Sequence, residues 1–287
     1  MTLTWVIRPG RRTPKPGPTW GFSVRERDAA AGLVRFAAMR QLLPAGVEDA
    51  DPAALYAGDD RTAPPGRPWV AVNMIATLDG ATSIGGVSGG LGAPADKAVF
   101  AALRAVADVI LVAAGTVRAE RYGPVHLADD QREARVGRGQ AAVPRLAVVT
   151  ARLDLALDEP LFTESVPPPI VLTVADAPAD RRAATQRVAE VVSFGHGAVD
   201  LAAALAWLAE EHAARIVLCE GGPSLNGALI DADLVDEWCQ TISPHLLSGP
   251  SARAAHSATA SPRRLEVTRV LEGDGLLFVR SVRAAPG

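Results

Sequence analysis

Residues 215–230 (Arg-Ile-Val-Leu-Cys-Glu-Gly-Gly-Pro-Ser-Leu-Asn-Gly-Ala-Leu-Ile) most constrain the fold, because they predict a strand that turns at once into a helix. The run 216–218 is short, apolar and β-branched, which suits a strand covered on both faces. The glycines at 221 and 222 permit a sharp turn and leave no side chain to keep a ligand away. Pro223 suits the first helical position, and Ser224 can hydrogen-bond the free amides of the first turn.

A helix that begins in this way presents unpaired N–H groups and the positive end of its dipole, which favours a phosphate or a diphosphate. The same spacing also suits a tight connection without a ligand, and the residues of this segment leave both interpretations open. A second junction, Gly115 and Thr116, follows the predicted strand 108–113. Open α/β sheets bind ligands beyond the carboxyl ends of their strands, so two such helix starts at one crevice could hold the two phosphates of a dinucleotide.

Strands alternate with helices along the rest of the chain, which predicts an α/β fold with a largely parallel sheet covered on both faces. Strands are expected at residues 70–77, 108–113, 146–150, 170–173, 188–194 and 236–243, with a final antiparallel hairpin of 265–271 and 276–282. A helix opens at Pro94 and directs Val99, Phe100, Leu103 and Val106 inward, and another covers 200–211. The final hairpin makes the predicted sheet mixed.

Three parts of the chain depart from this alternation of strands and helices. A helix is predicted over residues 25–43, and residues 59–68 have the composition of a proline-rich linker. Residues 1–67 are therefore expected to form an extension before the main domain at 68–287. Residues 83–93 are rich in glycine and are predicted to be a mobile loop. Residues 118–144 are long and polar, and a loop of that length is usually functional or disordered.

Composition excludes several classes of function. The net charge is −3 and no basic run is interleaved with aromatic residues, so no nucleic-acid partner is expected. Cys219 and Cys239 lie in apolar runs and suit core positions in a reducing compartment. The apolar run at residues 5–7 is too short for a signal peptide, and no stretch is long enough to span a bilayer. A soluble cytoplasmic protein is expected.

Familiar catalytic motifs are weak or missing in this sequence. There is no G-x-G-x-x-G and no G-x-x-x-x-G-K-[ST]. Residues 86–90 match G-x-S-x-G, but glycines surround the serine where a nucleophile elbow needs a strand and a helix, which argues against a hydrolase. The five histidines are scattered without metal-ligand spacing, so no metal site is predicted and His126 and His245 are assigned structural roles.

Three single residues are candidates for the chemistry. Glu220 stands between a strand end and two glycines, where it could accept hydrogen bonds from a turn or touch the reacting part of a ligand, and the second role is favoured. Asp79 belongs to Leu-Asp-Gly, in which Asp-Gly is a common pair in turns, so a structural role is its simpler interpretation. Arg104 lies on a helix near the expected crevice, where it could be solvated or could clamp an anion.

Four stretches, 68–80, 104–117, 220–227 and 234–247, together resemble the reductase domain of bacterial riboflavin-biosynthesis enzymes, the RibD C-terminal domain. The resemblance implies a three-layer αβα fold like that of dihydrofolate reductase, with NADPH as cofactor and a homodimer as assembly. It implies hydride transfer to a small molecule, a ribosylaminopyrimidine phosphate whose opened ribose becomes a ribityl chain. The first guess for this substrate is 5-amino-6-(5-phosphoribosylamino)uracil.

The resemblance also implies site residues. Those facing NADPH are Ala76, Gly115, Thr116, Glu120, Thr150, Gly221, Gly222, Pro223, Ser224 and Leu225. Those facing the substrate are Asn73, Ser88, Arg104 and Glu220, with Glu220 and Asp79 as the catalytic candidates. Arginines near the crevice loops, Arg118, Arg121 and Arg152, could meet a 2′-phosphate and so favour NADPH over NADH.

The sequence departs from the family pattern at three places. Residues 1–67 contain no H-x-E and no P-C-x-x-C, so they are not a zinc deaminase. Asn73 stands where the family often has lysine, and the downstream arginine for the substrate phosphate has no counterpart, although Arg121 could compensate. Two alternatives stay open: reduction of dihydrofolate or another small carbonyl compound, and binding of NADPH without turnover.

Overall fold

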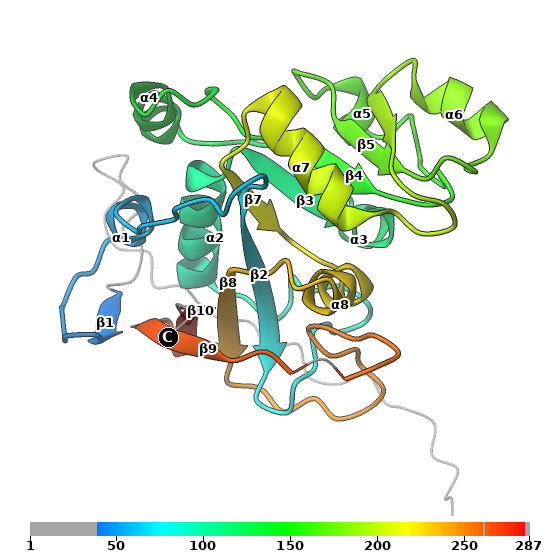
Figure 1. Cartoon of the computed structure of the whole chain (residues 1–287). Helices are drawn as coiled ribbons and strands as arrows, with labels where there is room; N and C mark the ends of the chain where they lie inside the picture. The colour runs from blue at the N-terminus through cyan, green and yellow to red at the C-terminus, as the bar shows by residue number, and fades with distance from the viewer. Residues whose placement is uncertain (1–38, 261, 285–287) are drawn as a thin grey trace, which may run out of the picture. The chain divides into compact units, whose positions relative to one another are not determined.

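The fold is seen in a computed structural model that describes residues 39–260 and 262–284, all within one compact unit. Its centre is a ten-stranded sheet with the strand order β1-β9-β10-β8-β2-β7-β3-β4-β5-β6 (Figure 1). The strands are β1 (Arg40–Leu43), β2 (Trp69–Thr77), β3 (Val109–Ala113), β4 (Arg145–Val149), β5 (Ile170–Thr173), β6 (Glu190–Ser193), β7 (Ile216–Cys219), β8 (Glu237–Ser243), β9 (Leu265–Gly273) and β10 (Leu276–Arg283).

Strand direction divides the sheet into two parts. From β8 through β2, β7, β3, β4 and β5 to β6, every neighbouring pair is parallel. At the other edge β8, β10, β9 and β1 pair antiparallel, because β9 and β10 form a hairpin. The predicted fold class, a mostly parallel mixed sheet with a C-terminal antiparallel hairpin, is confirmed.

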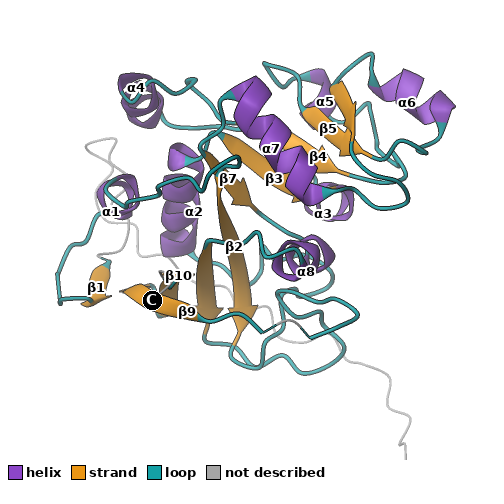
Figure 2. Ribbon diagram, viewed as in Figure 1, coloured by secondary structure: helices purple, strands orange, loops and turns teal. Residues whose placement is uncertain are grey.

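Helices cover both faces of this sheet (Figure 2). They are α1 (Pro52–Ala57), α2 (Pro94–Val106), α3 (Ala114–Glu120), α4 (Asp129–Gly137), α5 (Pro160–Thr163), α6 (Ala179–Thr185), α7 (Leu201–His212) and α8 (Pro223–Asp231). Side chains of α7 and α8 share one hydrophobic core with β2 and β7, whereas α2, α3 and α5 contribute to cores on the opposite face.

The two faces follow from the alternation of side chains along each strand. On β2, Val70 and Val72 belong to the core of α7 and α8, and Ala71 between them belongs to the core of α2. On β3, Leu111 belongs to the core of α7 and α8, and its neighbour Ile110 belongs to a core on the opposite face. Continuous apolar runs in these strands therefore reflect burial on both sides, as the sequence predicted.

The segment before the main domain differs from its prediction. Residues 40–43, the end of the predicted helix 25–43, form strand β1 and pair with β9; the rest of that helix lies outside the described residues. The segment 59–68 is irregular, but it is not a solvated linker, because Arg61 is buried and donates to Glu237, 176 residues later. Residues 39–67 belong to the same compact unit as the rest of the described chain, and the domain boundary expected at residue 68 stays a prediction.

The long polar segment 118–144 also differs from its prediction, since it contains helix α4. Asp129 and Asp130 favour the first turn of this helix through its dipole. Arg135 from α4 is fully buried and donates to the carbonyl oxygens of Ala105 and Ala107, at and just beyond the end of α2. The segment thus satisfies the last carbonyl groups of the helix that carries Arg104.

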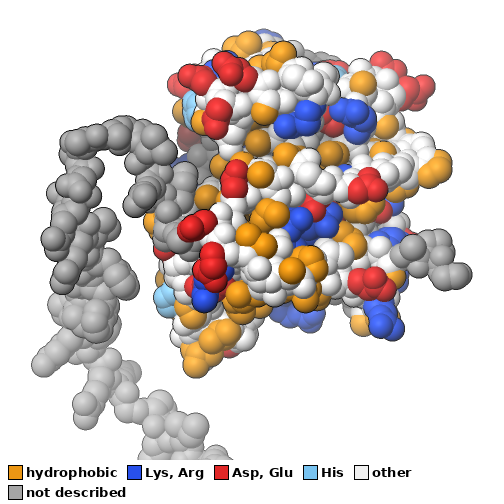
Figure 3. Space-filling model, turned by 90° about the vertical axis from the view of Figure 1, so that its left-hand side faces the viewer, with side chains coloured by type: hydrophobic (Ala, Val, Ile, Leu, Met, Phe, Trp, Pro, Cys, Tyr) orange, Lys and Arg blue, Asp and Glu red, His pale blue; other side chains and the backbone are white. Residues whose placement is uncertain are grey.

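The surface mixes charge and apolar area. On the face in Figure 3, acidic and basic side chains are interspersed with apolar ones. Within the described ranges, no helix combines the length and the apolar character needed to cross a membrane.

Candidate active site

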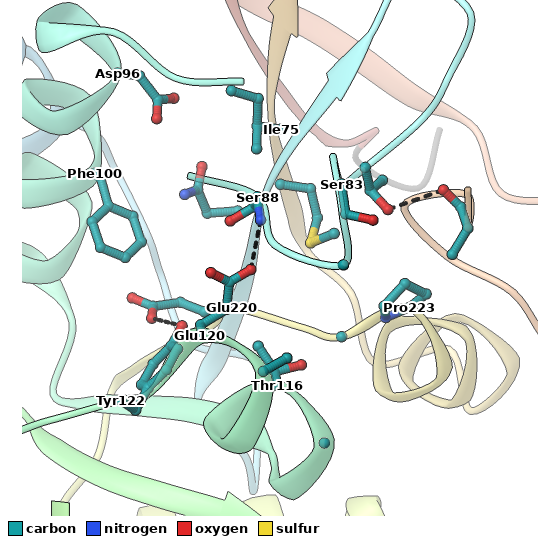
Figure 4. A pocket seen from close by; sticks show the side chains of 18 of the residues that line it. Ile75, Ser83, Ser88, Asp96, Phe100, Thr116, Glu120, Tyr122, Glu220 and Pro223 are labelled. Atoms are coloured by element: carbon teal, nitrogen blue, oxygen red, sulfur yellow. Dashed lines mark hydrogen bonds between the residues drawn. The ribbon is translucent and has the colours of Figure 1, made fainter. Parts of the chain in front are cut away.

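A pocket of about 530 Å³ opens at the carboxyl ends of β2, β3 and β7. This volume lies within the range of small-molecule sites, and the position is the one at which open α/β sheets bind ligands. Asn73, Met74 and Ile75 of β2 line it, and one wall is the face of α2 that carries Asp96 and Phe100 (Figure 4). The glycine-rich loop after β2 and the starts of α3 and α8 complete it.

Two glycine-to-helix junctions meet in this pocket. Gly222 precedes α8, which begins with Pro223, and Thr116 lies in the first turn of α3. A Cβ atom on Gly222 would come within 2.8 Å of Thr116 Oγ1, so a side chain at position 222 would fill the space between the two helix starts. Gly221 has φ of +81°, a backbone conformation that favours glycine. Both glycines are therefore required by the geometry of the turn.

Glu220 lies deep in the pocket at the end of β7, where two other side chains bind it. Arg104 donates from Nε to Oε1 and from Nη2 to Oε2, each at 2.7 Å. Tyr122 Oη donates to Oε2 at 2.7 Å. All three side chains line the pocket, and with 18% of its side chain exposed against 2% for Glu220, Arg104 is the more accessible member of the ion pair.

The electrostatics of this cluster follow from burial and charge. Burial raises the pKa of Tyr122 well above its ordinary value, and the charge of Glu220 raises it further. The phenol therefore keeps its proton and remains a hydrogen-bond donor. Burial alone would lower the pKa of Arg104, but the Glu220 carboxylate raises it. The pocket thus holds a fixed cation beside a protonated phenol.

The pocket face of α2 corrects one prediction. Phe100 was expected in the core with Val99, Leu103 and Val106, but it lines the pocket, and the Arg104 guanidinium lies 4.1 Å from its ring centroid. Lys97 also lines the pocket and is exposed. Arg121, the suggested replacement for the missing phosphate-binding arginine, is exposed and does not line it. Among the described residues that line the pocket, Lys97 is therefore the cation that forms no ion pair.

Most of the expected site residues come together here. The lining includes Asn73, Ser88, Arg104, Gly115, Thr116, Glu120, Glu220, Gly222 and Pro223. Ser88, on the glycine-rich loop, donates its backbone N–H to Glu120 Oε1 at 2.7 Å, as Figure 4 shows. This bond joins the loop to the end of α3.

Asp79 does not line the pocket, and its surroundings explain why. It is exposed in the turn after β2 and accepts hydrogen bonds from Thr77 Oγ1 and from the backbone N–H groups of Leu247 and Ser248. The Thr77 hydroxyl and then the Ser248 amide hold the pKa of Asp79 below its ordinary value. Asp79 therefore fixes a turn, and its role as a catalytic candidate stays a prediction that the pocket lining does not support.

The other predicted residues do not line the pocket. They are Ala76, Thr150, Gly221, Ser224 and Leu225. Ser224 is exposed and makes no capping hydrogen bond, which corrects its predicted role; the N-cap position belongs to Gly222. Thr150 Oγ1 accepts from the backbone N–H of Leu153 and so stabilises the turn after β4.

Sequence reasoning missed several lining residues, notably Asp96, Lys97, Phe100 and Tyr122. Asp96, Phe100 and Arg104 are spaced by four, so they share a helical face, and this spacing was the signal available in the sequence. Tyr122 stood in a segment treated as a polar loop. No local pattern marked it, because its partner Glu220 lies 98 residues away.

Comparison with known proteins leads to the same family that the sequence resembles. The family model described as "RibD C-terminal domain" matches residues 68–275. A 2,5-diamino-6-ribosylamino-4(3H)-pyrimidinone 5′-phosphate reductase of Archaeoglobus fulgidus is 30% identical over 211 residues, 72% of this chain and 95% of that protein. The protein of the same name from Methanothermobacter thermautotrophicus is 32% identical over 189 residues, 65% of this chain and 82% of that protein.

Among solved structures, a pyrimidine reductase-like protein of Corynebacterium diphtheriae is similar, with a TM-score of 0.70 and 24% identity. The match covers 76% of this chain and 93% of that one, and it concerns the fold. Together the matched family and the curated relatives define the protein as an oxidoreductase, a reductase with an α/β fold. The chain belongs to the RibD C-terminal domain family of riboflavin-biosynthesis reductases, so the resemblance found in the sequence is confirmed.

Proposed function

We propose that this protein uses NADPH to reduce the sugar chain of a ribosylaminopyrimidine 5′-phosphate. One observation carries the proposal: the junctions at Thr116 and Gly222 and the Arg104–Glu220 pair all line a single pocket. The curated relatives, named for a 2,5-diamino-6-ribosylaminopyrimidinone phosphate, support the substrate class.

The proposed cofactor fits the residues present. Gly222 and Thr116 approach each other so closely that a Cβ atom at position 222 would lie 2.8 Å from Thr116 Oγ1, and the first turn of α8 offers backbone N–H groups at this junction. These groups suit a diphosphate, which no side chain at position 222 obstructs. Arg121 and Arg152 are exposed near this side of the sheet and are proposed to meet the 2′-phosphate that distinguishes NADPH from NADH. Arg118 already donates to the Asp154 carbonyl oxygen.

When bound, the cofactor supplies the hydride ion. Reduction of a carbonyl or imine carbon adds this hydride to carbon and a proton to the neighbouring oxygen or nitrogen. The part of the protein is to hold the substrate carbon in place and to stabilise developing charge. Arg104, fixed by two bonds to Glu220, offers a positive charge that does not need to reorganise.

Charge in the pocket also suits a phosphorylated substrate. Asn73, a neutral amide on β2, cannot provide the charge that a lysine would provide there. Lys97 lines the same pocket from α2 and is exposed, so its ammonium group can reach a phosphate at the mouth. We assign Lys97 this contact, and Arg121 is no longer needed for it.

The test follows NADPH absorbance with purified protein. Three acceptors are compared: the 2,5-diamino-6-ribosylaminopyrimidinone phosphate, its deaminated uracil counterpart, and dihydrofolate. Oxidation with either ribosylaminopyrimidine supports the proposal. Oxidation with dihydrofolate alone would replace it with the alternative that the sequence left open. Tight NADPH binding with no oxidation by any acceptor would assign a binding protein without turnover.

Assembly and location complete the proposal. The family resemblance supports a homodimer in the cytoplasm. Sedimentation velocity at micromolar concentration tests the assembly: a single species of twice the 29.8 kDa chain mass is expected, and a monomer would contradict it.

A further inference from the structure

One face of α2 presents three chemically different side chains to the pocket. Asp96, Phe100 and Arg104 follow each other at intervals of four residues, so they form a stripe along the helix. All of them line the pocket, and Figure 4 shows Asp96 and Phe100 on the side away from Thr116 and Pro223. Arg104 is committed to Glu220. The remaining polar group of the stripe is the Asp96 carboxylate.

Contacts with β8 and with Gly92 hold the Asp96 side chain in place. Its Oδ1 atom accepts a hydrogen bond of 2.9 Å from Thr241 Oγ1 on β8. Its Oδ2 atom lies beside Gly92, where a Cβ atom would come within 2.7 Å of it. Across the described ranges, no lysine, arginine or histidine forms an ion pair with Asp96, and Oδ2 accepts no hydrogen bond from the protein. Burial raises the pKa of Asp96.

The pocket contains two other carboxylates, and each holds part of the protein in place. Glu220 accepts three hydrogen bonds, two from Arg104 and one from Tyr122. Glu120 accepts the backbone N–H of Ser88 and so secures the glycine-rich loop. Asp96 therefore keeps Oδ2 for a ligand on the face of α2 that carries Phe100. Glu120 also keeps one oxygen, but it lies at the end of α3 and is engaged in holding the loop. A partly buried acceptor of this kind is satisfied best by N–H donors of the ligand.

We propose that Asp96 recognises the 2-amino-4-oxopyrimidine edge of the substrate and makes the protein prefer a ring that still carries its 2-amino group. This inference rests on the proposed function. The edge presents the N3–H and 2-amino groups side by side, which matches the two oxygens of a carboxylate. In the deaminated ring the 2-amino group is replaced by a carbonyl oxygen, which faces the carboxylate as a second acceptor and is disfavoured. Phe100, one turn further on, supplies an apolar wall beside the ring.

A pterin carries the same 2-amino-4-oxo edge, so the recognised chemistry is shared by two kinds of ligand. The experiment separates them by measuring kcat/KM for the 2,5-diamino-6-ribosylaminopyrimidinone phosphate, its uracil counterpart and dihydrofolate. The wild type is expected to favour the diamino compound over the uracil by about tenfold or more, as expected for one mismatched hydrogen-bonding group. Turnover of dihydrofolate in place of the diamino compound would keep the role of Asp96 and assign the edge to a pterin.

The decisive variant is Asp96→Asn, which keeps the size of the side chain and a partner for Thr241. Its amide can donate to the 2-carbonyl of the uracil compound, so the preference is expected to fall to near unity or to reverse. Glu120→Gln is the matched control in the same pocket and should lower both rates without changing their ratio. Thermal unfolding confirms that both variants fold.

An unchanged substrate ratio in Asp96→Asn would overturn the inference, even if both rates fall, because a merely structural role lowers them together. A changed ratio in Glu120→Gln, with none in Asp96→Asn, would also overturn it. A wild type that reduces no ribosylaminopyrimidine and no dihydrofolate would instead remove the proposed function on which the inference rests.

Discussion

Two arginine–glutamate clusters are attached to the same sheet, and they differ in what lies next to them. In the pocket cluster, Arg104 binds Glu220 through two bonds, and Tyr122 donates a third. In the second cluster Glu237 on β8 receives two bonds from each of Arg61 and Arg280. An aromatic donor, Trp69 Nε1, completes this buried cluster at 3.1 Å.

The clusters share their chemistry and differ in access. The Arg104 side chain is 18% exposed and reaches the pocket, whereas Arg61, Glu237 and Arg280 are 2%, 0% and 7% exposed. No residue of the buried cluster lines the pocket. The comparison suggests that the buried cluster fixes the segment before β2 to the sheet, while the pocket cluster offers its charge to a ligand. Buried charge alone thus does not identify a functional site in this protein.

The largest effect is expected from Glu237→Gln. Removing the acid leaves two buried guanidinium groups with less compensation, and the loss of one partner of a buried pair costs about 3–5 kcal/mol. Urea unfolding at neutral pH measures this as a lower free energy of unfolding. Below the unfolding transition, kcat/KM should match that of the wild type. A loss below about 1 kcal/mol, as for an exposed pair, would remove the distinction between the two clusters.

Lowering the pH should remove the stability that Glu237 contributes to the buried cluster. Burial would raise the pKa of Glu237, but Arg61 and Arg280 lower it from 4.5 to about 2. A lowered pKa in the folded state contributes stability that is present above pH 4.5 and is lost as pH falls toward 2. The stability difference between wild type and Glu237→Gln should therefore shrink over this window. The variant serves as the reference because Asp233, beside Arg283, also has a pKa of about 2. A difference that stays constant with pH would contradict the assignment.

Glu220→Gln should impair catalysis more than stability, whereas Glu237→Gln should impair stability alone. The amide keeps the shape of the side chain but leaves Arg104 without its counter-charge, so the cation is held less firmly. We expect kcat/KM to fall by about tenfold to a hundredfold, the scale of a charged hydrogen bond. The free energy of unfolding should fall less than in Glu237→Gln, because water in the pocket can solvate Arg104. Unchanged kinetics with a large loss of stability would make this cluster structural as well.

A smaller effect is expected where a methyl group is added at the helix junction. In Gly222→Ala the new Cβ atom would lie 2.8 Å from Thr116 Oγ1. We expect the dissociation constant for NADPH to rise about tenfold, equivalent to about 1.4 kcal/mol. Gly137→Ala is the matched control, because no atom lies within 4 Å of its added Cβ atom and it is outside the pocket. Equal NADPH affinity in both variants would argue against a diphosphate at this junction.

Prediction from sequence succeeded where the signal is local. The apolar run at residues 170–173 predicted β5 with its observed bounds, and Pro94 and Pro223 each begin the expected helix. The paired junctions at Gly115 and Gly222 came from spacing alone. These elements and junctions depend on short-range preferences for strand, turn and helix start, which a single sequence displays.

The failures have a common physical cause, which is contact between distant residues. Arg61 stood in a segment that looked like a linker, because its partner Glu237 is 176 residues away. Tyr122 and Arg135 stood in a polar segment whose burial depends on Glu220 and on the end of α2. Phe100 was assigned to the core because an apolar residue on a helix cannot, from sequence alone, be distinguished from one that lines a pocket.

The central claim is that the paired junctions bind a nicotinamide cofactor whose reacting end points toward the Arg104–Glu220 cluster. A crystal structure of the protein with NADPH measures this directly. We expect the diphosphate against the first turns of α3 and α8, with the nicotinamide in the pocket lined by Glu220 and Arg104. A cofactor bound elsewhere on the sheet, or a pocket that stays empty at saturating NADPH, would contradict it.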